Sequence, residues 1–492
     1  MTGPLQLAEP TLVRRLRDVL VAASFTSEKI GDALGTEGEI LSRAADIPVH
    51  LRRLERHGAF GALVRLFILD LDVPEDQLAS AIAPLTTDDL MTLHVAERNS
   101  GAVRPLVRIV PHDELLITSD VRLGAGESAP ADHVPGVHRP SVTLAHLTVR
   151  RRARSFLDLG TGCGVEALLA SAHADRVLAT DVSARATNFA AFNAQLNGAN
   201  NIEFRVGSWF EPVGDERFEI IACNPPYVIS PASEFIYRDS GLVGDSVSEQ
   251  VVRSIPAHLE EGGFATIAIS WIVDPEADAS APVRRWVADG GCDAWLLHYR
   301  TDEPLTTAAG WNQTESGDPA RYAEHIDKWM AYYRELDIRG IAYGSLVLRR
   351  RRGANWFRTD PLPPGRLRPA SDHILRIFAA QDLLAGGRDE DSLLDERIRV
   401  APRAIVEQRV RFPGGAPRIE EMSLTLDEGV GFQAGLDPKV LLLLTQLDGT
   451  RTLRQALTEA AKRDGASDTD RYVRAGLPVA RRMFELGFLE RV

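Results

Sequence analysis

The chain has 492 residues, of which 25% are charged, and its formal net charge is −13 at pH 7. This length predicts about three domains and allows a large buried core. The acidic balance argues against a protein that binds bulk nucleic acid, because neutralising phosphate groups requires clustered Lys and Arg. Two arginine clusters, at residues 150–154 and 349–352, could bind phosphate, although such runs are more often solvated strand edges or helix ends.

The cysteine spacing and the hydropathy pattern indicate in which cellular compartment the protein is expected. Cys163, Cys223 and Cys292 are not spaced as a metal-binding or redox pair, so we expect neither a disulfide framework nor a metal site. This usage fits a reducing cytoplasm. The N-terminus lacks the basic and apolar regions of an export signal, and no apolar run approaches the roughly 18 residues of a membrane span. We therefore expect a soluble, cytoplasmic protein with no membrane partner.

Residues 1–125 form the first predicted domain. Amphipathic helices are expected within residues 12–69, and two strand-like runs follow at residues 103–110 and 114–119. Helices followed by a hairpin indicate a winged-helix-like module. Such a module dimerises or covers a pocket in some enzymes and reads DNA in regulators, and the acidic balance favours the first role.

Residues 126–352 form the second predicted domain, in which strands and helices alternate. This alternation predicts an α/β fold with a doubly wound, largely parallel sheet that binds ligands at the carboxyl ends of its strands. An amphipathic stretch over residues 321–336 connects the last two strands, which are expected to form an antiparallel edge pair. The expected strands lie at residues 156–159, 177–180, 202–206, 220–223, 264–270, 294–299 and 345–350.

The C-terminal part is predicted as a linker over residues 353–394 and a third domain over residues 395–492. Residues 353–370 are rich in Pro, Arg and Gly, which is typical of a linker. The last segment contains strand-like and helical pieces and ends in a helix followed by Gly-Phe-Leu. It resembles a winged helix of the peptide-recognition type.

A glycine-rich turn lies between the first strand and the first helix of the middle domain. Gly160, Gly162 and Gly164 allow the backbone to approach a ligand because they lack a Cβ atom. The dinucleotide fingerprint places its third glycine one residue later, at Val165 in this chain, so the spacing disfavours NAD. The next strand ends in Asp181, where a carboxylate commonly binds two ribose hydroxyls. A cap for the following helix is the alternative role, and the two roles can coexist.

The tetrapeptide Asn224, Pro225, Pro226 and Tyr227 leaves the carboxyl end of an apolar strand. Two successive prolines remove backbone donors and fix φ, which makes the corner rigid. The Asn224 amide oxygen and the Pro225 carbonyl can accept the two hydrogens of a planar NH2 group, and Tyr227 can cover its flat face. Taken alone, the tetrapeptide could also be an ordinary turn at the end of a strand.

Together these motifs resemble the class I S-adenosylmethionine-dependent methyltransferases that act on amino and amide nitrogens. HemK-like glutamine N5-methyltransferases are the most similar group, followed by the rRNA guanine-N2 enzymes, and adenine-N6 enzymes share the Asn-Pro-Pro-Tyr corner. The resemblance implies a seven-stranded, Rossmann-like domain and the cofactor S-adenosyl-L-methionine, and the winged-helix-like domains predicted above would flank it. It is carried by Asp158–Gly164, Asp181, Gly207–Phe210 and Asn224–Tyr227.

The resemblance also implies roles for individual residues. Asn224, Pro225, Pro226 and Tyr227 would bind the acceptor and act in catalysis. Ser208 departs from the family, which often has an acidic residue for the adenine amino group, and a serine hydroxyl accepts that hydrogen bond more weakly. The residues implied to bind the cofactor are Asp158, Gly160, Thr161, Gly162, Cys163, Gly164, Asp181, Val182, Gly207, Ser208, Trp209 and Asn224.

The predicted activity is methyl transfer to a planar amide or amino nitrogen of a protein, peptide or small molecule. An rRNA or DNA amino-group methyltransferase is the first alternative. A non-catalytic regulator that binds the cofactor is the second, but such a sensor would not need the acceptor-binding corner. The sequence leaves open the identity of the acceptor, the role of the terminal domains and a possible homodimer.

Overall fold

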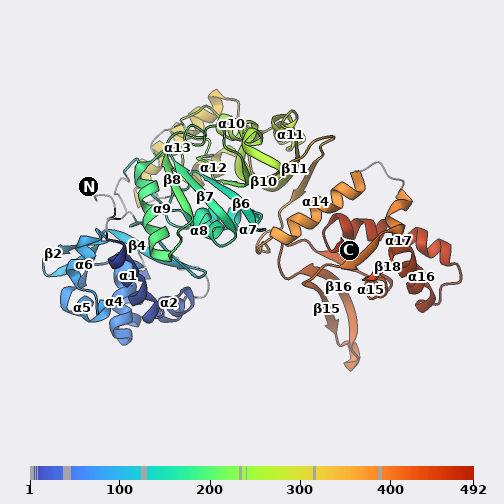
Figure 1. Cartoon of the computed structure of the whole chain (residues 1–492), viewed down its shortest axis with the longest axis horizontal. Helices are drawn as coiled ribbons and strands as arrows, with labels where there is room; N and C mark the ends of the chain where they lie inside the picture. The colour runs from blue at the N-terminus through green and yellow to red at the C-terminus, as the bar shows by residue number, and fades with distance from the viewer. Residues whose placement is uncertain are drawn as a thin grey trace. The chain divides into compact units, whose positions relative to one another are not determined.

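The structure is a computed structural model that describes residues 5, 7, 9–36, 46–122, 130–231, 235–239, 241–313, 317–385 and 390–492. The chain divides into two compact units (Figure 1). The first unit consists of residues 1–144 and 152–359, and the second consists of residues 145–151 and 360–492. The predicted boundary between residues 125 and 126 lies outside the described residues, so it stays a prediction.

The N-terminal part of the first unit is mainly helical, as expected. Thr26 and Thr86 cap two of its helices, since each side chain accepts a hydrogen bond from a backbone N–H three residues later. The helices are α1 (Pro10–Ala22), α2 (Ser27–Leu34), α3 (Ile47–Leu54), α4 (Gly58–Phe67), α5 (Glu75–Ile82) and α6 (Thr87–Thr92). The strands are β1 (Val73–Pro74), β2 (Ala96–Asn99) and β3 (Ala102–Pro105), which form one sheet, and the hairpin β4 (Val107–His112) and β5 (Leu115–Asp120). Helices therefore precede a hairpin, while the winged-helix assignment stays a prediction.

The centre of the first unit is an eight-stranded sheet in the order β13-β11-β12-β10-β9-β6-β7-β8. Neighbouring strands from β10 to β8 in this order are parallel, and β12 is antiparallel to both β10 and β11. The antiparallel pairing of the last two predicted strands is thus confirmed. The strands are β6 (Ala153–Leu159), β7 (Ala174–Asp181), β8 (Ile202–Val206), β9 (Phe218–Cys223), β10 (Leu259–Val273), β11 (Cys292–Asp302), β12 (Gly340–Arg350) and β13 (Phe357–Pro361).

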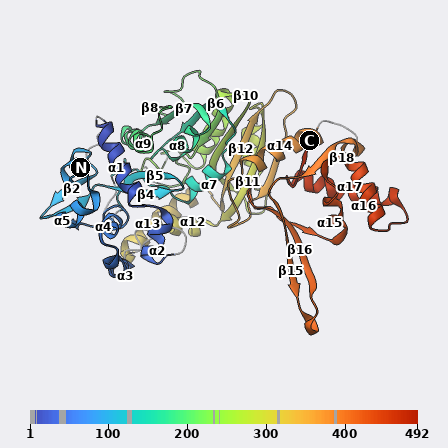
Figure 2. The same ribbon diagram turned by 60° about the horizontal axis from the view of Figure 1, so that its bottom comes forward.

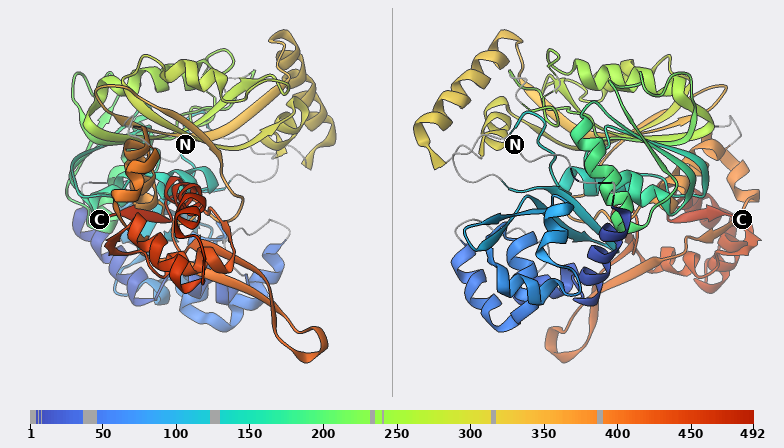
Figure 3. Two further views of the ribbon diagram at one scale, coloured as in Figure 1. Left: turned by 90° about the vertical axis from the view of Figure 1, so that its right-hand side faces the viewer. Right: turned by 60° about the vertical axis from the view of Figure 1, so that its left-hand side comes forward.

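Helices lie on both faces of this sheet (Figure 3). The helices α10 and α11 bury one core against the strands, whereas α8 and α9 belong to a second core that extends into the N-terminal helices. This arrangement is the doubly wound α/β fold that the alternating pattern predicts. The helices of this part are α7 (Arg139–Leu147), α8 (Val165–Ser171), α9 (Ala184–Asn197), α10 (Ser246–Ser254), α11 (Ala281–Val287), α12 (Pro304–Trp311) and α13 (Pro319–Glu335).

The segment 353–394 differs from the expected linker. Its residues include β13, which adds an eighth strand to the seven that were predicted, and α14 (Ser371–Ala385). Helix α14 buries Ile374, Ile377 and Phe378 completely, because their spacing places them on one helical face. The abundance of Pro, Arg and Gly in the first part of the segment hides this apolar stripe.

The second unit contains two small sheets, β18-β14-β19 and β15-β16-β17. The strands β15 and β16 form a long hairpin that extends away from the helices of this unit (Figure 2). The elements that follow α14 are β14 (Arg397–Val400), β15 (Ala404–Arg411), β16 (Arg418–Leu426), β17 (Ala434–Leu436), α15 (Pro438–Leu444), β18 (Asp448–Thr452), α16 (Leu453–Arg463), α17 (Thr469–Glu485) and β19 (Leu489–Arg491). Within the described parts of the chain, no helix has the length and apolar character needed to cross a membrane.

Candidate active site

A cavity of about 650 Å³ lies at the carboxyl ends of the parallel strands β6, β7 and β9. Every residue predicted to bind the cofactor or the acceptor lines this cavity, with the exception of Gly164. The structure therefore brings together motifs that are up to 69 residues apart in the chain, from Asp158 to Tyr227.

The three glycines of the turn between β6 and α8 have two different functions. All three have positive φ values, of +80° at Gly160, +54° at Gly162 and +87° at Gly164, which favour glycine. A Cβ atom on Gly160 or Gly162 would meet no atom within 4 Å, so open space adjoins both residues. A Cβ atom on Gly164 would lie 2.9 Å from the Cβ of Ala190. Gly164 thus allows close packing against α9, whereas Gly160 and Gly162 leave room for a ligand.

Asp158 holds the glycine turn in place. Its Oδ2 atom accepts hydrogen bonds from the Thr161 hydroxyl at 2.6 Å and from the Ala167 N–H at 3.0 Å. The side chain is buried, and burial raises its pKa to about 7 despite these two donors. The carboxyl group therefore connects the end of β6 to the first turn of α8.

Asp181 ends β7 and faces the turn. Its Oδ2 atom accepts a hydrogen bond from the Gly162 N–H at 2.9 Å, and its Oδ1 atom accepts one from the Ser183 N–H at 2.9 Å. Burial raises the pKa of this carboxyl, while the two backbone donors oppose the shift. The side-chain cap of α9 is Ser183, which accepts a hydrogen bond from the Ala186 N–H. The alternative role of Asp181 as the cap of α9 is therefore wrong.

Residues after β8 form a loop at the same end of the sheet. Gly207 donates its N–H to the Asp181 carbonyl at 3.0 Å, and Trp209 has a positive φ of +47°. The Ser208 N–H donates to the Glu211 carboxylate at 3.3 Å. An acidic group thus lies near Ser208, three residues later in the chain. Val182, which follows the neighbouring strand β7, is 55% exposed.

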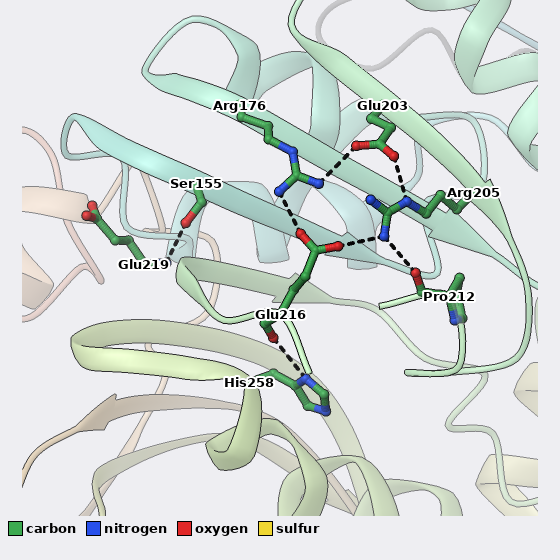
Figure 4. Close-up of polar contacts among 8 residues, drawn as sticks. All are labelled: Ser155, Arg176, Glu203, Arg205, Pro212, Glu216, Glu219 and His258. Carbon is green, nitrogen blue, oxygen red and sulfur yellow. Dashed lines mark hydrogen bonds and ion pairs between the residues drawn. The ribbon is translucent and has the colours of Figure 1, made fainter. Parts of the chain in front are cut away.

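A salt-bridge network fixes the base of this loop (Figure 4). Arg205 donates to the Pro212 carbonyl at 2.8 Å and pairs with Glu216 at 2.7 Å. Arg176 pairs with Glu216 at 2.7 Å, and both arginines also pair with Glu203. Hydrogen bonds from Arg176 lower the pKa of Glu216, with burial opposing them. The network therefore ties β7 and β8 to the loop that carries Ser208 and Trp209.

The Asn-Pro-Pro-Tyr corner follows β9. The Tyr227 N–H donates to the Pro225 carbonyl at 2.7 Å, and the Ser270 hydroxyl donates to the Tyr227 carbonyl. The Pro225 oxygen therefore has one lone pair left for an acceptor NH2 group. Among the residues that the structure describes, the Asn224 side-chain amide has no hydrogen-bond partner. Burial raises the pKa of the Tyr227 hydroxyl, so this group stays protonated at neutral pH.

Several residues that line the cavity belong to none of the sequence motifs described above. Trp311 comes from the helical insertion between β11 and β12, and Tyr237 and Arg238 come from a segment that folds back to Tyr227 through a β-bridge at Asp239. The N-terminal hairpin and the residue after it contribute further polar side chains. Only the folded chain brings these segments to the cavity, which is why local motifs could not identify them. The lining residues from the hairpin region are Arg108, Asp120 and Arg122.

The cysteines at the site are buried thiols. Burial raises the pKa of Cys163 to about 12, and it also raises the pKa of Cys223. Neither thiol is therefore an activated nucleophile. In the described ranges, no group of three His, Cys, Asp or Glu side chains is arranged to hold a metal ion.

Two known families match parts of this chain. Residues 22–106 match a domain of unknown function (DUF7059), and residues 140–270 match the methyltransferase small domain. The second match begins in α7 and ends in β10, so it includes the glycine turn, Asp181 and the Asn-Pro-Pro-Tyr corner.

Curated relatives with similar sequences are glutamine methyltransferases. The release factor glutamine methyltransferase of Xylella fastidiosa (strain Temecula1) is 35% identical over 163 residues, which cover 30% of this chain and 54% of the relative. The enzyme of the same name from Aliivibrio fischeri is 46% identical over 90 residues, which cover 18% and 31%. The ribosomal protein uL3 glutamine methyltransferase of Bradyrhizobium diazoefficiens is 35% identical over 144 residues, which cover 27% and 44%. The chain thus spans about half of the length of these relatives, or less. The central domain of this chain is a methyltransferase domain of class I, and within that class it is similar to the HemK-like glutamine methyltransferases.

Proposed function

We propose that this protein is an S-adenosyl-L-methionine-dependent methyltransferase that methylates a side-chain amide nitrogen of a protein or peptide. The observation that carries the proposal is the Asn224 amide, which has no hydrogen-bond partner among the described residues and lines the same cavity as the glycine turn and Asp181. Asn224 is half-buried and lines the cavity, so its amide oxygen can accept a hydrogen bond from a ligand there. The names of the relatives, which refer to release factors and to ribosomal protein uL3, favour a protein acceptor.

The residues at the glycine turn fit S-adenosyl-L-methionine. Open space adjoins Gly160 and Gly162, so the backbone can approach the cofactor closely. Each oxygen of Asp181 accepts one backbone N–H and keeps a lone pair for a ribose hydroxyl. Ser208 and Trp209 would border the adenine ring. The bound cofactor supplies a methyl group on a positively charged sulfur.

The corner residues would hold and orient the acceptor nitrogen. The Asn224 amide oxygen and the remaining lone pair of the Pro225 carbonyl would accept the two N–H hydrogens, so the nitrogen lone pair is directed into the cavity. These acceptors also stabilise the positive charge that develops on nitrogen. Tyr227 covers the planar group with its ring. Because alignment contributes up to about 7–11 kcal/mol in favourable cases, the side chains need not include a strong base.

Two variants separate acceptor binding from cofactor binding. Asn224→Ala should reduce turnover by at least about 100-fold, as the loss of one preorganised polar contact does, while the calorimetric Kd of S-adenosylhomocysteine changes little. Asp181→Ala should instead raise that Kd. Wild-type turnover in Asn224→Ala would contradict the role of the corner, and an unchanged Kd in Asp181→Ala would remove this residue from the ribose site.

A further inference from the structure

The hairpin of the second unit has a long unpaired edge. In the sheet β15-β16-β17, the strand β15 (Ala404–Arg411) is hydrogen-bonded to β16, and no other strand of the described residues pairs with its second edge. All residues of β15 after Ala404 are exposed. Figures 1 and 2 show that this hairpin extends beyond the helices of its own unit. Proteins usually shorten, cover or charge such an edge because its free N–H and C=O groups pair with other strands.

The hairpin exposes large apolar side chains among its charged ones. Val406 is 38% exposed, Val410 is 40% exposed, and Phe412 at the tip is 67% exposed. Val406 and Val410 lie on the same face of the strand because side chains alternate along it. An exposed row of this kind indicates an interaction surface more than a solvated edge.

The sequence of β15 is complementary to itself in the antiparallel direction. If two copies pair about a two-fold axis at Gln408, Val406 lies opposite the partner's Val410. Glu407 then lies opposite the partner's Arg409, and Arg409 opposite the partner's Glu407. Residues directly opposite each other in an antiparallel pair interact through their side chains, and opposite charges stabilise the pair. A two-fold interface requires this kind of self-complementarity, in which the same patch serves both subunits.

Within the hairpin itself, Arg409 has an acidic partner across the strands but Glu407 has no basic one. Arg409 lies opposite Glu421 in β16 and pairs with it at 3.3 Å, whereas Glu407 lies opposite Ser423. Within the described residues, Glu407 forms no ion pair. A second copy would place Arg409 between Glu421 and the partner's Glu407, and it would give Glu407 the cation that its own hairpin lacks.

We propose that the free edge of β15 pairs with β15 of a second copy of this chain, so that the protein forms a two-fold homodimer with a sheet continuous across the two hairpins. In this dimer the backbone N–H and C=O groups on the free edges of the two β15 strands form hydrogen bonds with each other. Val406 of each copy packs against Val410 of the other, and the ion pairs between Glu407 and Arg409 set the register. The hairpin belongs to the second unit of the chain, whereas the residues that line the methyltransferase cavity belong to the first.

Charge-reversal variants of the full-length protein test the interface by sedimentation velocity. Glu407→Arg places two arginines opposite each other at both symmetric positions, and Arg409→Glu does the same with two glutamates. Each variant alone should dimerise at least about tenfold more weakly than the wild type, since each adds two like-charge contacts. An equimolar mixture should recover the dimer, because every mixed pair is again Glu with Arg. Arg474→Glu, an exposed change on α17, is the control and should dimerise like the wild type.

Two outcomes would overturn the proposal. The first is a wild-type protein that stays monomeric up to about 100 μM, a concentration at which even weak specific dimers form. The second is a wild-type dimer whose strength does not change in either single variant, which would place the interface elsewhere. A mixture that stays monomeric while the wild type dimerises would also overturn it, because the antiparallel register would then be wrong.

Discussion

Asp158 and Asp181 show how position decides the role of two carboxyl groups in one cavity. Asp158 is 2% exposed and bonds to the turn and to α8, and its pKa rises to about 7. Asp181 is partly exposed and holds the turn through Gly162. The first group is therefore structural and partly protonated at neutral pH, whereas the second is placed to accept hydrogen bonds from a ligand.

The raised pKa of Asp158 predicts a pH-dependent stability. Between about pH 4 and pH 7 the folded protein keeps a proton on Asp158 that the unfolded chain has released, since the ordinary value is 3.8. The contribution of this group to stability is thus fully present below about pH 4, is lost as the pH rises towards the folded pKa of about 7, and changes little above it. Asp158→Asn imitates the protonated form, so the variant should not lose stability as the pH rises. Urea denaturation midpoints measured from pH 5 to pH 8 would test this.

A matched substitution controls for a general effect of charge. Asp175 also lies in the sheet, in β7, but it is 56% exposed and pairs only with the exposed Arg152. Asp175→Asn should therefore keep the wild-type pH profile. If Asp158→Asn loses stability with rising pH as steeply as the wild type does, the pKa shift of Asp158 is not the cause.

Sequence motifs identified the residues of the site that lie close together in the chain. The glycine turn, Asp181 and the Asn-Pro-Pro-Tyr corner all follow strands, and parallel strands bring their carboxyl ends to one edge. Trp311 and Tyr237 were missed because they reach the cavity through segments whose path depends on the whole fold. The capping role considered for Asp181 was wrong because Ser183, two residues later, satisfies the helix N-terminus.

The glycine turn and α9 form one structural element, since Gly164 lies against Ala190. Gly164→Ala should therefore lower stability for two reasons, the strain of a positive φ, about 1–2 kcal/mol, and overpacking, about 1–3 kcal/mol more. Gly198→Ala at the end of α9 is the matched control. Its φ of +72° is also strained, but no atom lies within 4 Å of the new Cβ.

The difference between these two glycine variants measures the contact with α9. We expect Gly164→Ala to have the lower urea midpoint and also a raised Kd for S-adenosylhomocysteine, because the shifted turn adjoins the proposed cofactor site. Equal midpoints in the two variants would show that the packing of the turn against Ala190 contributes nothing beyond backbone strain.

The strands of the sheet were predicted from the periodicity of apolar residues, and the linker was predicted from its composition. The first prediction was more accurate than the second. The buried parallel strands are short apolar runs, so their positions could be found from the sequence. The segment 353–394 contains β13 and α14, although Pro, Arg and Gly dominate its first part. Edge strands such as β13 have weak patterns because one side faces no neighbour, and their pairing depends on the rest of the sheet.

The charges of the whole molecule favour a protein acceptor over nucleic acid. The net charge is −13, and the arginine clusters that could bind phosphate are largely neutralised. Arg349 and Arg351 both pair with the fully buried Asp293, and Arg154 pairs with Glu219 and Glu260. These arginines therefore form ion pairs at the ends of β6 and β12, which makes them poor candidates for binding a phosphate backbone.

Labelling with a methyl-labelled cofactor tests which class of acceptor the enzyme uses. In a cell extract with the full-length protein, we expect the label to enter macromolecules that protease digests and nuclease does not. Asn224→Ala should reduce this incorporation at least about 100-fold, which distinguishes transfer by this enzyme from background methylation. Nuclease-sensitive label that depends on Asn224 would instead identify an amino group of RNA or DNA as the acceptor. In that case the acidic surface would have to be compensated by cations at the cavity itself, where Arg108 and Arg122 line the wall.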